Sequence, residues 1–233
     1  IAPDIPLHAS TQMSLHTLGG ACRAAELGLE RVVLARELSR RDIHTITRGC
    51  PAEIEVFVHG ALCMCYSGQC FMSSVIGGRS GNRGLCAQPC RMAYGFDGGK
   101  PAPWLSLKDL SLCTHLQELE QAGVACVKIE GRMKRPEYVA VVTKAYRSAI
   151  DGKRVTEENM KELEAVFSRQ GFTQGYYEGK IGQDMFGTRQ EQNPDKELYA
   201  KARATYESGE TPRVPVKFYA MVRAGEPAQL AAQ

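Results

Sequence analysis

The sequence predicts an α/β fold in which short strands and amphipathic helices alternate. Two observations support this: brief apolar, often β-branched runs recur along the chain, and stretches with helical periodicity separate them. Such alternation is typical of parallel strands joined by crossover helices. Because the visible strands are too few to close an eight-stranded barrel, we expect a partial (β/α) barrel lacking its first strands. An open doubly wound sheet is the second interpretation.

Each predicted element has local support in the sequence. Ser39 and Thr156 are typical N-cap residues, and Pro136 suits the first turn of a helix. Gly28 and Gly123 are typical helix ends. Strands are predicted at 5–10, 31–35, 53–60 and 124–131, and helices at 14–28, 40–47, 111–123, 137–152 and from 157 to about 171.

We expect three parts along the chain. Residues 1–152 are predicted to form the partial barrel with a cysteine-rich loop at 61–95 (the cysteine loop), 153–211 a C-terminal helical extension, and 212–233 the start of a further β-rich module. The sequence begins without Met and stops on a strand and turn just begun. We therefore expect a fragment that lacks both ends.

Composition limits the partners. The 233 residues, 43% of them hydrophobic, suit one core, and the formal net charge of +3 is close to neutral. The overall charge therefore gives no reason to expect a nucleic-acid partner, and any binding of an anion has to come from a local cluster of basic residues. No apolar run approaches the roughly 20 residues that cross a bilayer, so no membrane partner is expected. Clustered cysteines without a secretion signal favour a cytoplasmic location.

Five of the nine cysteines fall between residues 63 and 90. Cys63, Cys70, Cys86 and Cys90 are separated by six, fifteen and three residues. A zinc site usually has two tight pairs, whereas a [4Fe–4S] cluster tolerates irregular spacing. The spacing therefore favours an iron–sulfur cluster, while a zinc site and thiols that bind no metal remain as alternatives. Cys126 could replace one of the four.

Polar residues occupy one face of several predicted strands, mostly late in the strand. A parallel strand buried on both faces should be almost uniformly apolar. In barrels, late strand positions form the active site, although a solvated face or a Lys128–Glu130 ion pair is the alternative. Arg36 and Glu37 follow another strand. The shared faces are His8, Ser10 and Gln12; Glu55, Phe57 and His59; and Lys128, Glu130 and Arg132.

The segment 77–91, "GGRSGNRGLCAQPCR", carries Arg79, Arg83 and Arg91 and no acidic residue. Glycines let backbone N–H groups approach an anion, and guanidinium groups match phosphate or carboxylate. An RNA backbone or a carboxylate-bearing small molecule would fit, and a solvated surface loop is the alternative.

These residues resemble the collagenase-like peptidase family U32. The stretch "EVFVHGALCMCYSGQCFMS" matches its signature throughout, and "HASTQ", "VLARELS", "GGRSGNRGLCAQPCR", "LSLKDL" and "KIEGRMK" look like family blocks in the family's order. The resemblance covers residues 5–150 well and weakens beyond them. The matching signature positions are Glu55, Phe57, Gly60, Ala61, Leu62, Cys63, Gly68, Cys70, Met72 and Ser73.

The resemblance implies a TIM-like barrel that carries a [4Fe–4S] cluster. Better-understood relatives hydroxylate a tRNA uridine using prephenate, a ribosomal RNA cytidine, or a ubiquinone precursor, and the loop looks most similar to the RNA-hydroxylating branch. The resemblance implies the same four cysteine ligands, with Cys126 as the alternative fourth. We therefore expect an iron–sulfur-dependent protein that hydroxylates a pyrimidine in tRNA or 23S rRNA.

Two other classes stay open: a U32-type peptidase, and a non-enzymatic iron–sulfur partner protein in hydroxylation. The sequence has neither G-x-S-x-G nor H-E-x-x-H, and no spacing places a group to orient His59 beside Ser67. For the RNA-hydroxylating interpretation, the expected partners also include a carboxylate-bearing small molecule such as prephenate and a further protein. The catalytic candidates are Glu55, His59, Lys128 and Glu130, and the substrate-binding candidates are His8, Gln12, Arg36, Arg79, Asn82, Arg83, Arg132 and Lys134.

Overall fold

The computed structural model describes residues 5–95, 97–132, 134–188, 195–207, 218–221, 223 and 229–232. Their main sheet follows the order β1 (His8–Ala9), β2 (Arg31–Val33), β3 (Glu53–Ala61), β4 (Asp109–Ser111) and β6 (Phe172–Thr173). A sixth strand, β5 (Cys126–Ile129), pairs with β3 outside this path. Strands β1, β2, β3 and β5 are mutually parallel.

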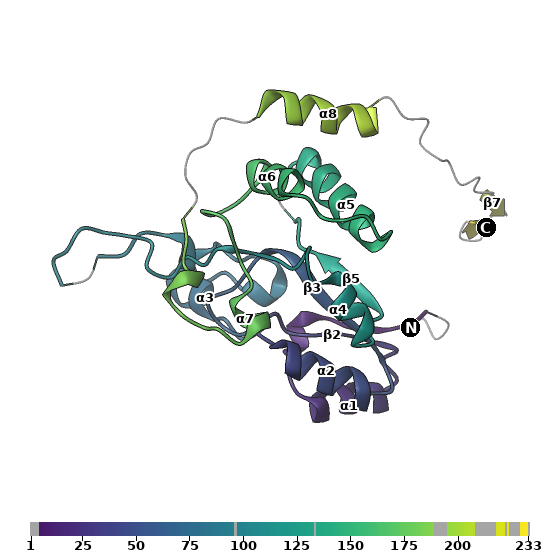
Figure 1. The fold of residues 1–233 in the computed structure, drawn as a ribbon. Coiled ribbons are helices and arrows are strands. Elements are labelled where there is room, and N and C mark those ends of the chain that lie inside the picture. The colour runs from purple at the N-terminus through teal and green to yellow at the C-terminus, as the bar shows by residue number, and fades with distance from the viewer. Residues whose placement is uncertain are drawn as a thin grey trace.

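Helices lie around this sheet (Figure 1). In that view α1 and α2 lie side by side below β2, and α5, α6 and α8 are stacked above β3 and β5. The helices are α1 (Leu18–Glu26), α2 (Arg40–Gly49), α3 (Met72–Gly77), α4 (Leu116–Gln121), α5 (Pro136–Ile150), α6 (Glu157–Val166), α7 (Gly175–Glu178) and α8 (Lys196–Glu207).

The predicted caps are confirmed. Ser39 and Thr156 each accept a hydrogen bond from the backbone N–H three residues on, and Asp42 and Asn159 complete two capping boxes. Pro136 occupies the first turn of α5.

The helix predicted at 111–123 is wrong in its first five residues. Residues 109–111 form β4, which runs antiparallel to the end of β3, with His59 opposite Ser111 and Ala61 opposite Asp109. The helix begins only at Leu116. The sheet is therefore mixed rather than parallel throughout.

A β-bulge at Val58 changes which residues of β3 share a face. Phe57 pairs with Lys128 and His59 pairs with Ile129, so Val58 is an extra residue on β3. Such a bulge shifts the alternation of side chains beyond it. The predicted common face of Glu55, Phe57 and His59 therefore ends at Phe57.

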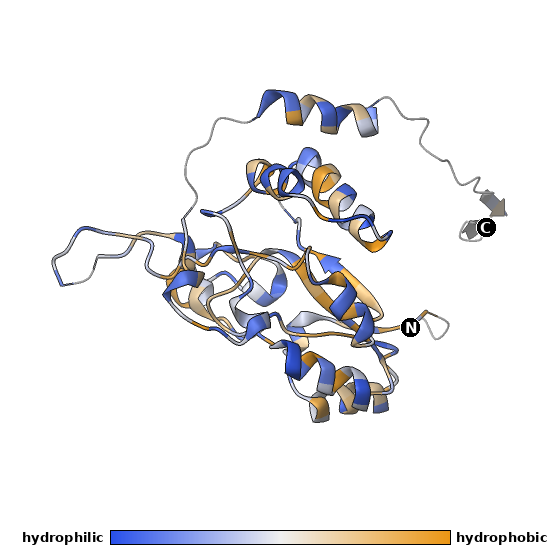
Figure 2. Ribbon diagram, viewed as in Figure 1, coloured by the Kyte–Doolittle hydropathy of each residue, from blue (hydrophilic) through white to orange (hydrophobic). Residues whose placement is uncertain are grey.

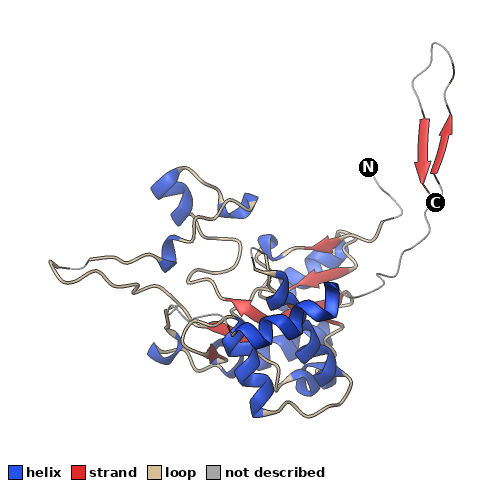
Figure 3. Ribbon diagram, turned by 90° about the horizontal axis from the view of Figure 1, so that it is seen from above, coloured by secondary structure: helices blue, strands red, loops and turns tan. Residues whose placement is uncertain are grey.

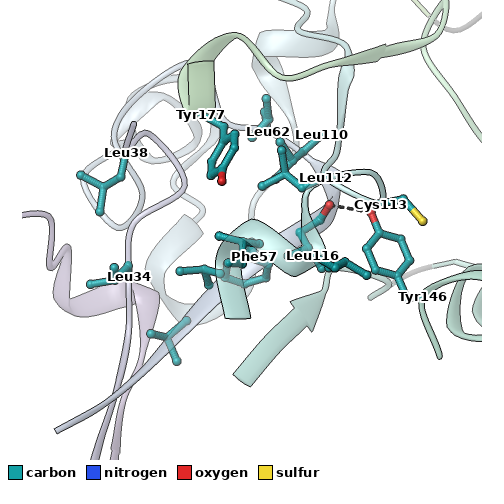
Figure 4. Packing of buried hydrophobic residues seen from close by; sticks show 14 of the residues in the cluster. Leu34, Leu38, Phe57, Leu62, Leu110, Leu112, Cys113, Leu116, Tyr146 and Tyr177 are labelled. Carbon is teal, nitrogen blue, oxygen red and sulfur yellow. Dashed lines mark hydrogen bonds between the residues drawn. The ribbon is translucent and has the colours of Figure 1, made fainter. Parts of the chain in front are cut away.

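The core lies between the sheet and its helices. Leu34, Phe57, Leu62 and Leu110 pack together, and Tyr146 of α5 reaches the sheet, where its hydroxyl donates to the Val58 carbonyl at 2.7 Å (Figure 4). Figure 2 shows hydrophobic residues along β3 and β5 and hydrophilic ones over much of α2 and α8.

The later residues continue this arrangement. Within 153–211, α6 and α8 pack on α5, and β6 joins the main sheet by pairing with β4. Strands β7 (Phe218–Met221) and β8 (Gln229–Ala232) form a separate antiparallel hairpin (Figure 3). The α/β class is confirmed, while the barrel and the three-part division stay predictions. No described helix is both long and apolar enough to cross a membrane.

Candidate functional site

Two glycines of the signature fix the path of the cysteine loop. Gly60 has φ +111°, and a Cβ there would lie 2.6 Å from the Glu130 carbonyl oxygen. Gly68 has φ +82°, and its Cβ would lie 2.8 Å from the carbonyl oxygen of Gln12. Only glycine accommodates both the positive φ and the close approach. The loop is thereby pressed against the end of β5 and against the short 3₁₀ helix η1 (Thr11–Met13).

Polar contacts secure the same segment. The carboxylate of Glu37 accepts hydrogen bonds from the backbone N–H and the hydroxyl of Ser67, at 3.1 and 3.0 Å. Burial raises the pKa of Glu37, and these two bonds oppose that rise. The Asn82 amide donates to the Gly68 carbonyl at 2.6 Å, so one part of the loop holds another.

The four predicted ligand cysteines lie along this loop. Cys63 follows β3, Cys70 precedes α3, and Cys90 lies in the 3₁₀ helix η3 (Pro89–Arg91). Burial raises the pKa of Cys90, and Cys86 and Cys70 raise it further, so these thiols are close enough to interact electrically. The pKa of Cys63 is likewise raised by burial and, in smaller part, by Cys90.

Gly81 lies between two of these cysteines. A Cβ on Gly81 would be 3.7 Å from the Cβ of Cys86 and 3.8 Å from the carbonyl oxygen of Cys70. Cys126 has different surroundings, because it pairs in register with Glu55, and Glu55, Arg31 and Lys128 are its charged neighbours. The alternative that Cys126 replaces one of the four therefore loses support.

The donor set fits a thiolate-bound cofactor. All nine cysteines are free, and clustered thiolates are what [4Fe–4S] clusters use and what zinc also accepts. Within the described part of the chain, no three His, Cys, Asp or Glu side chains are already grouped tightly enough to hold a metal ion. Binding of a single metal ion would therefore require the cysteine side chains to move closer together.

Arg36 links the cysteine loop to the end of β5. Its guanidinium donates to Glu130 at 2.8 Å and to the sulfur of Cys63 at 3.7 Å. The same group lies 4.0 Å above the centre of the Phe57 ring. Glu130 also accepts a hydrogen bond from the backbone N–H of Arg132.

Lys128 and Glu130 do not pair with each other. Lys128 instead lies 2.9 Å from the buried carboxylate of Glu55, which Arg31 approaches to 3.5 Å from β2. The Glu55 group therefore lies within the strands, apart from the Arg36–Glu130 pair beyond the end of β5.

His59 stands apart from these ion pairs. Its Nδ1 lies 3.2 Å from the hydroxyl of Tyr146, and its ring packs among those of Tyr138, Tyr146 and Phe172. Burial, with a smaller contribution from Lys134, lowers the pKa of His59 to about 3. The imidazole is therefore neutral at physiological pH and lies in the core.

Sequence reasoning missed a buried ion pair and misjudged one arginine. Asp109 of β4 pairs with Arg169 at 2.5 Å, with both side chains buried. The block "LSLKDL" was the available signal for Asp109, and none marked Arg169. Arg91, grouped with the anion-binding arginines, instead donates to the Leu62 carbonyl at 2.5 Å and the Leu107 carbonyl at 2.6 Å.

The remaining substrate-binding candidates divide into two groups. Arg79 and Arg83 are exposed on the loop, and Arg132 reaches to 3.2 Å from the position of a Cβ on Gly84. Gln12 is exposed where η1 meets the loop. The structure does not place the other two at the loop: His8 is exposed in β1 opposite Arg31, and Lys134 lies 2.6 Å above the Phe167 ring centre.

These features define an α/β protein with ion-paired strand ends beside a four-cysteine loop. The chain belongs to peptidase family U32, whose sequence profile matches residues 1–186.

Several curated proteins are similar to this chain. It is 38% identical over 208 residues to "tRNA hydroxylation protein P1" of Bacillus subtilis (strain 168), covering 80% of this chain and 49% of that protein. It is 44% identical over 155 residues to "23S rRNA 5-hydroxycytidine C2501 synthase" of Escherichia coli (strain K12), covering 64% and 24%. A "Collagenase" of Porphyromonas gingivalis (strain ATCC BAA-308 / W83) is 37% identical over 202 residues, covering 76% and 48%.

This chain spans about half or less of the length of these relatives. No solved structure matches it significantly.

Proposed function

We propose that this chain is part of an iron–sulfur-dependent enzyme that hydroxylates a pyrimidine in tRNA or 23S rRNA. The observation that carries the proposal is that Cys90 lies near enough to Cys63, Cys70 and Cys86 to interact with each electrostatically. Cys63 also contacts Arg36 of the Arg36–Glu130 pair. The names of the tRNA- and rRNA-hydroxylating relatives support RNA as the substrate class.

The four cysteines would hold the cofactor, which when bound supplies a route for electrons at the strand ends. Glu130 is fixed there by Arg36 and by the backbone of Arg132, and its carboxylate can accept a proton. His59 contributes by packing, because it is buried and neutral.

The exposed loop contributes the binding surface. Arg79 and Arg83 are free of the carbonyl contacts that engage Arg91, and guanidinium groups bind phosphate. Arg132 lies against the same loop at Gly84. A carboxylate-bearing oxygen donor such as prephenate would use the same chemistry, and it stays part of the proposal.

A peptidase is the second candidate, favoured by the similarity to a collagenase. Its generic nucleophile and base are not assembled: the Ser67 hydroxyl is buried and bonded to Glu37, whereas His59 is bonded to Tyr146. The non-enzymatic partner role stays the third candidate.

Nucleoside mass spectrometry tests the proposal. A strain lacking the full-length protein should lose one hydroxylated pyrimidine from tRNA or rRNA. The wild-type gene and a Cys22→Ala variant should restore it, because Cys22 lies in α1 away from the loop, whereas Cys70→Ala should not. An unchanged nucleoside profile together with lost gelatin cleavage would favour the peptidase instead.

A further inference from the structure

We infer that Arg36 is a positioning residue for Cys63 that sets the reduction potential of the cluster bound there. The inference rests on the proposed iron–sulfur function and goes beyond it, because it assigns to the cofactor a residue that the sequence assigned to substrate. It is carried by the contacts of the guanidinium group.

Three contacts hold that group in one place. One terminal nitrogen donates to Glu130 at 2.8 Å, the other donates to the Cys63 sulfur at 3.7 Å, and the Phe57 ring lies beneath at 4.0 Å. The Arg36 side chain is only 11% exposed. Both ends of the guanidinium are therefore engaged within the protein, and little of it is left to bind RNA.

The neighbouring arginines show that this arrangement is particular. Arg79 and Arg83 belong to the same site region and are exposed. Arg91 is half-buried, and its charge lies near Cys63 and Cys90, but its hydrogen bonds go to the Leu62 and Leu107 carbonyls and the Ser106 hydroxyl rather than to a sulfur. Among the described arginines, Arg36 is the one with a hydrogen bond to a cysteine sulfur.

A hydrogen bond and a positive charge at a ligand sulfur stabilise the reduced, more negative form of a cluster. Net charge and hydrogen bonds to sulfur are two main determinants of cluster potential. Arg36 should therefore raise the potential. Glu130 carries the opposite charge in the same ion pair and should lower it.

Opposite signs make the test specific. Full-length protein, loaded anaerobically with iron and sulfide, is compared by electrochemistry monitored with visible absorbance and EPR. At a fixed applied potential, Arg36→Gln should lower the reduced-to-oxidised ratio about tenfold, a shift of about 59 mV for one electron. Arg36→Lys should shift less, and Glu130→Gln should shift the potential upward.

Arg40→Gln is the matched control. Arg40 lies four residues away, is mostly exposed and pairs with Glu118, so its removal should leave the potential unchanged. An unchanged potential in loaded Arg36→Gln would overturn the inference, as would shifts of the same sign in Arg36→Gln and Glu130→Gln. If Arg36→Gln takes up no cluster, the downward shift of Arg36→Lys and the upward shift of Glu130→Gln decide it.

The failure of the proposed function looks different. Wild-type protein without iron and sulfide would end both the proposal and this inference. Wild-type protein with a cluster whose potential ignores Arg36 would end the inference alone.

Discussion

The main sheet and the cysteine loop differ in how they accommodate charged and apolar side chains. On the strands, carboxylates are matched with cations: Glu55 with Lys128, Asp109 with Arg169. The cysteine loop instead exposes apolar side chains, among them Phe71 and Val75, 68% and 84% exposed. Buried charge has to be paired within the protein, whereas a loop that binds a ligand can keep side chains exposed to solvent until the ligand covers them. We interpret the sheet with its buried ion pairs as a scaffold and the loop as the binding part.

The largest effect should come from breaking the most buried pair. Asp109→Asn leaves the buried Arg169 guanidinium without its counter-charge, and we expect a loss of about 3–5 kcal/mol in the free energy of unfolding. Denaturant unfolding measures it. The control is Asp151→Asn in the exposed Arg147–Asp151 pair of α5, which should cost less than about 1 kcal/mol. Equal losses of unfolding free energy in the two variants would contradict a larger contribution from the buried pair than from the exposed pair.

Gly60→Ala tests where scaffold and loop meet. The positive φ should cost about 1–2 kcal/mol, and the contact with the Glu130 carbonyl a further 1–3 kcal/mol or so. Gly78→Ala is the control, since Gly78 has φ +65° but nothing within 4 Å of its Cβ position. Thermal unfolding should show the larger loss for Gly60→Ala, and equal losses would contradict the close approach.

The buried His59 makes the scaffold sensitive to acid. Its native pKa is about 3, below the ordinary 6.5, so the unfolded chain binds the proton first as the pH falls. Stability should therefore decline between pH 6.5 and 3 by about 1.4 kcal/mol per pH unit from this group, with no effect above that range. Unfolding of the wild type and His59→Gln across this range measures it. Parallel pH profiles would contradict the buried neutral imidazole.

Arg83→Gln should have the smallest effect on folding. Arg83 is exposed, so its removal should change stability by less than about 0.5 kcal/mol. It should nevertheless weaken tRNA binding and reduce the salt dependence of binding by about one phosphate contact. Filter binding of full-length protein at several salt concentrations measures this, with exposed Arg48→Gln of α2 as the control. Identical effects of the two variants on tRNA binding would contradict the proposal that the loop forms the RNA-binding surface.

Local signals in the sequence were sufficient for much of the fold. The caps at Ser39 and Thr156 and the Pro136 start of α5 depend on a few adjacent residues, so they could be predicted. The family signature likewise located Gly60 and Gly68, and the structure shows the close contacts that require glycine at both positions.

Non-local pairing could not be predicted in the same way. Strand β4 is short, and its antiparallel partner β3 lies about fifty residues earlier, so the pattern of the following helix hid it. The bulge at Val58 interrupts an alternation that looks regular in the sequence. Ion-pair partners such as Asp109 and Arg169 are sixty residues apart, and only the fold brings them together.

The most direct test of the central claim is the iron and acid-labile sulfide content of anaerobically purified full-length protein. We predict about four of each per chain with a visible absorbance band, as a [4Fe–4S] cluster requires. Loss is expected in Cys63→Ser and Cys90→Ser, but not in Cys22→Ser. Wild-type protein that binds neither element, or one that binds a single zinc ion and no sulfide, would contradict the account.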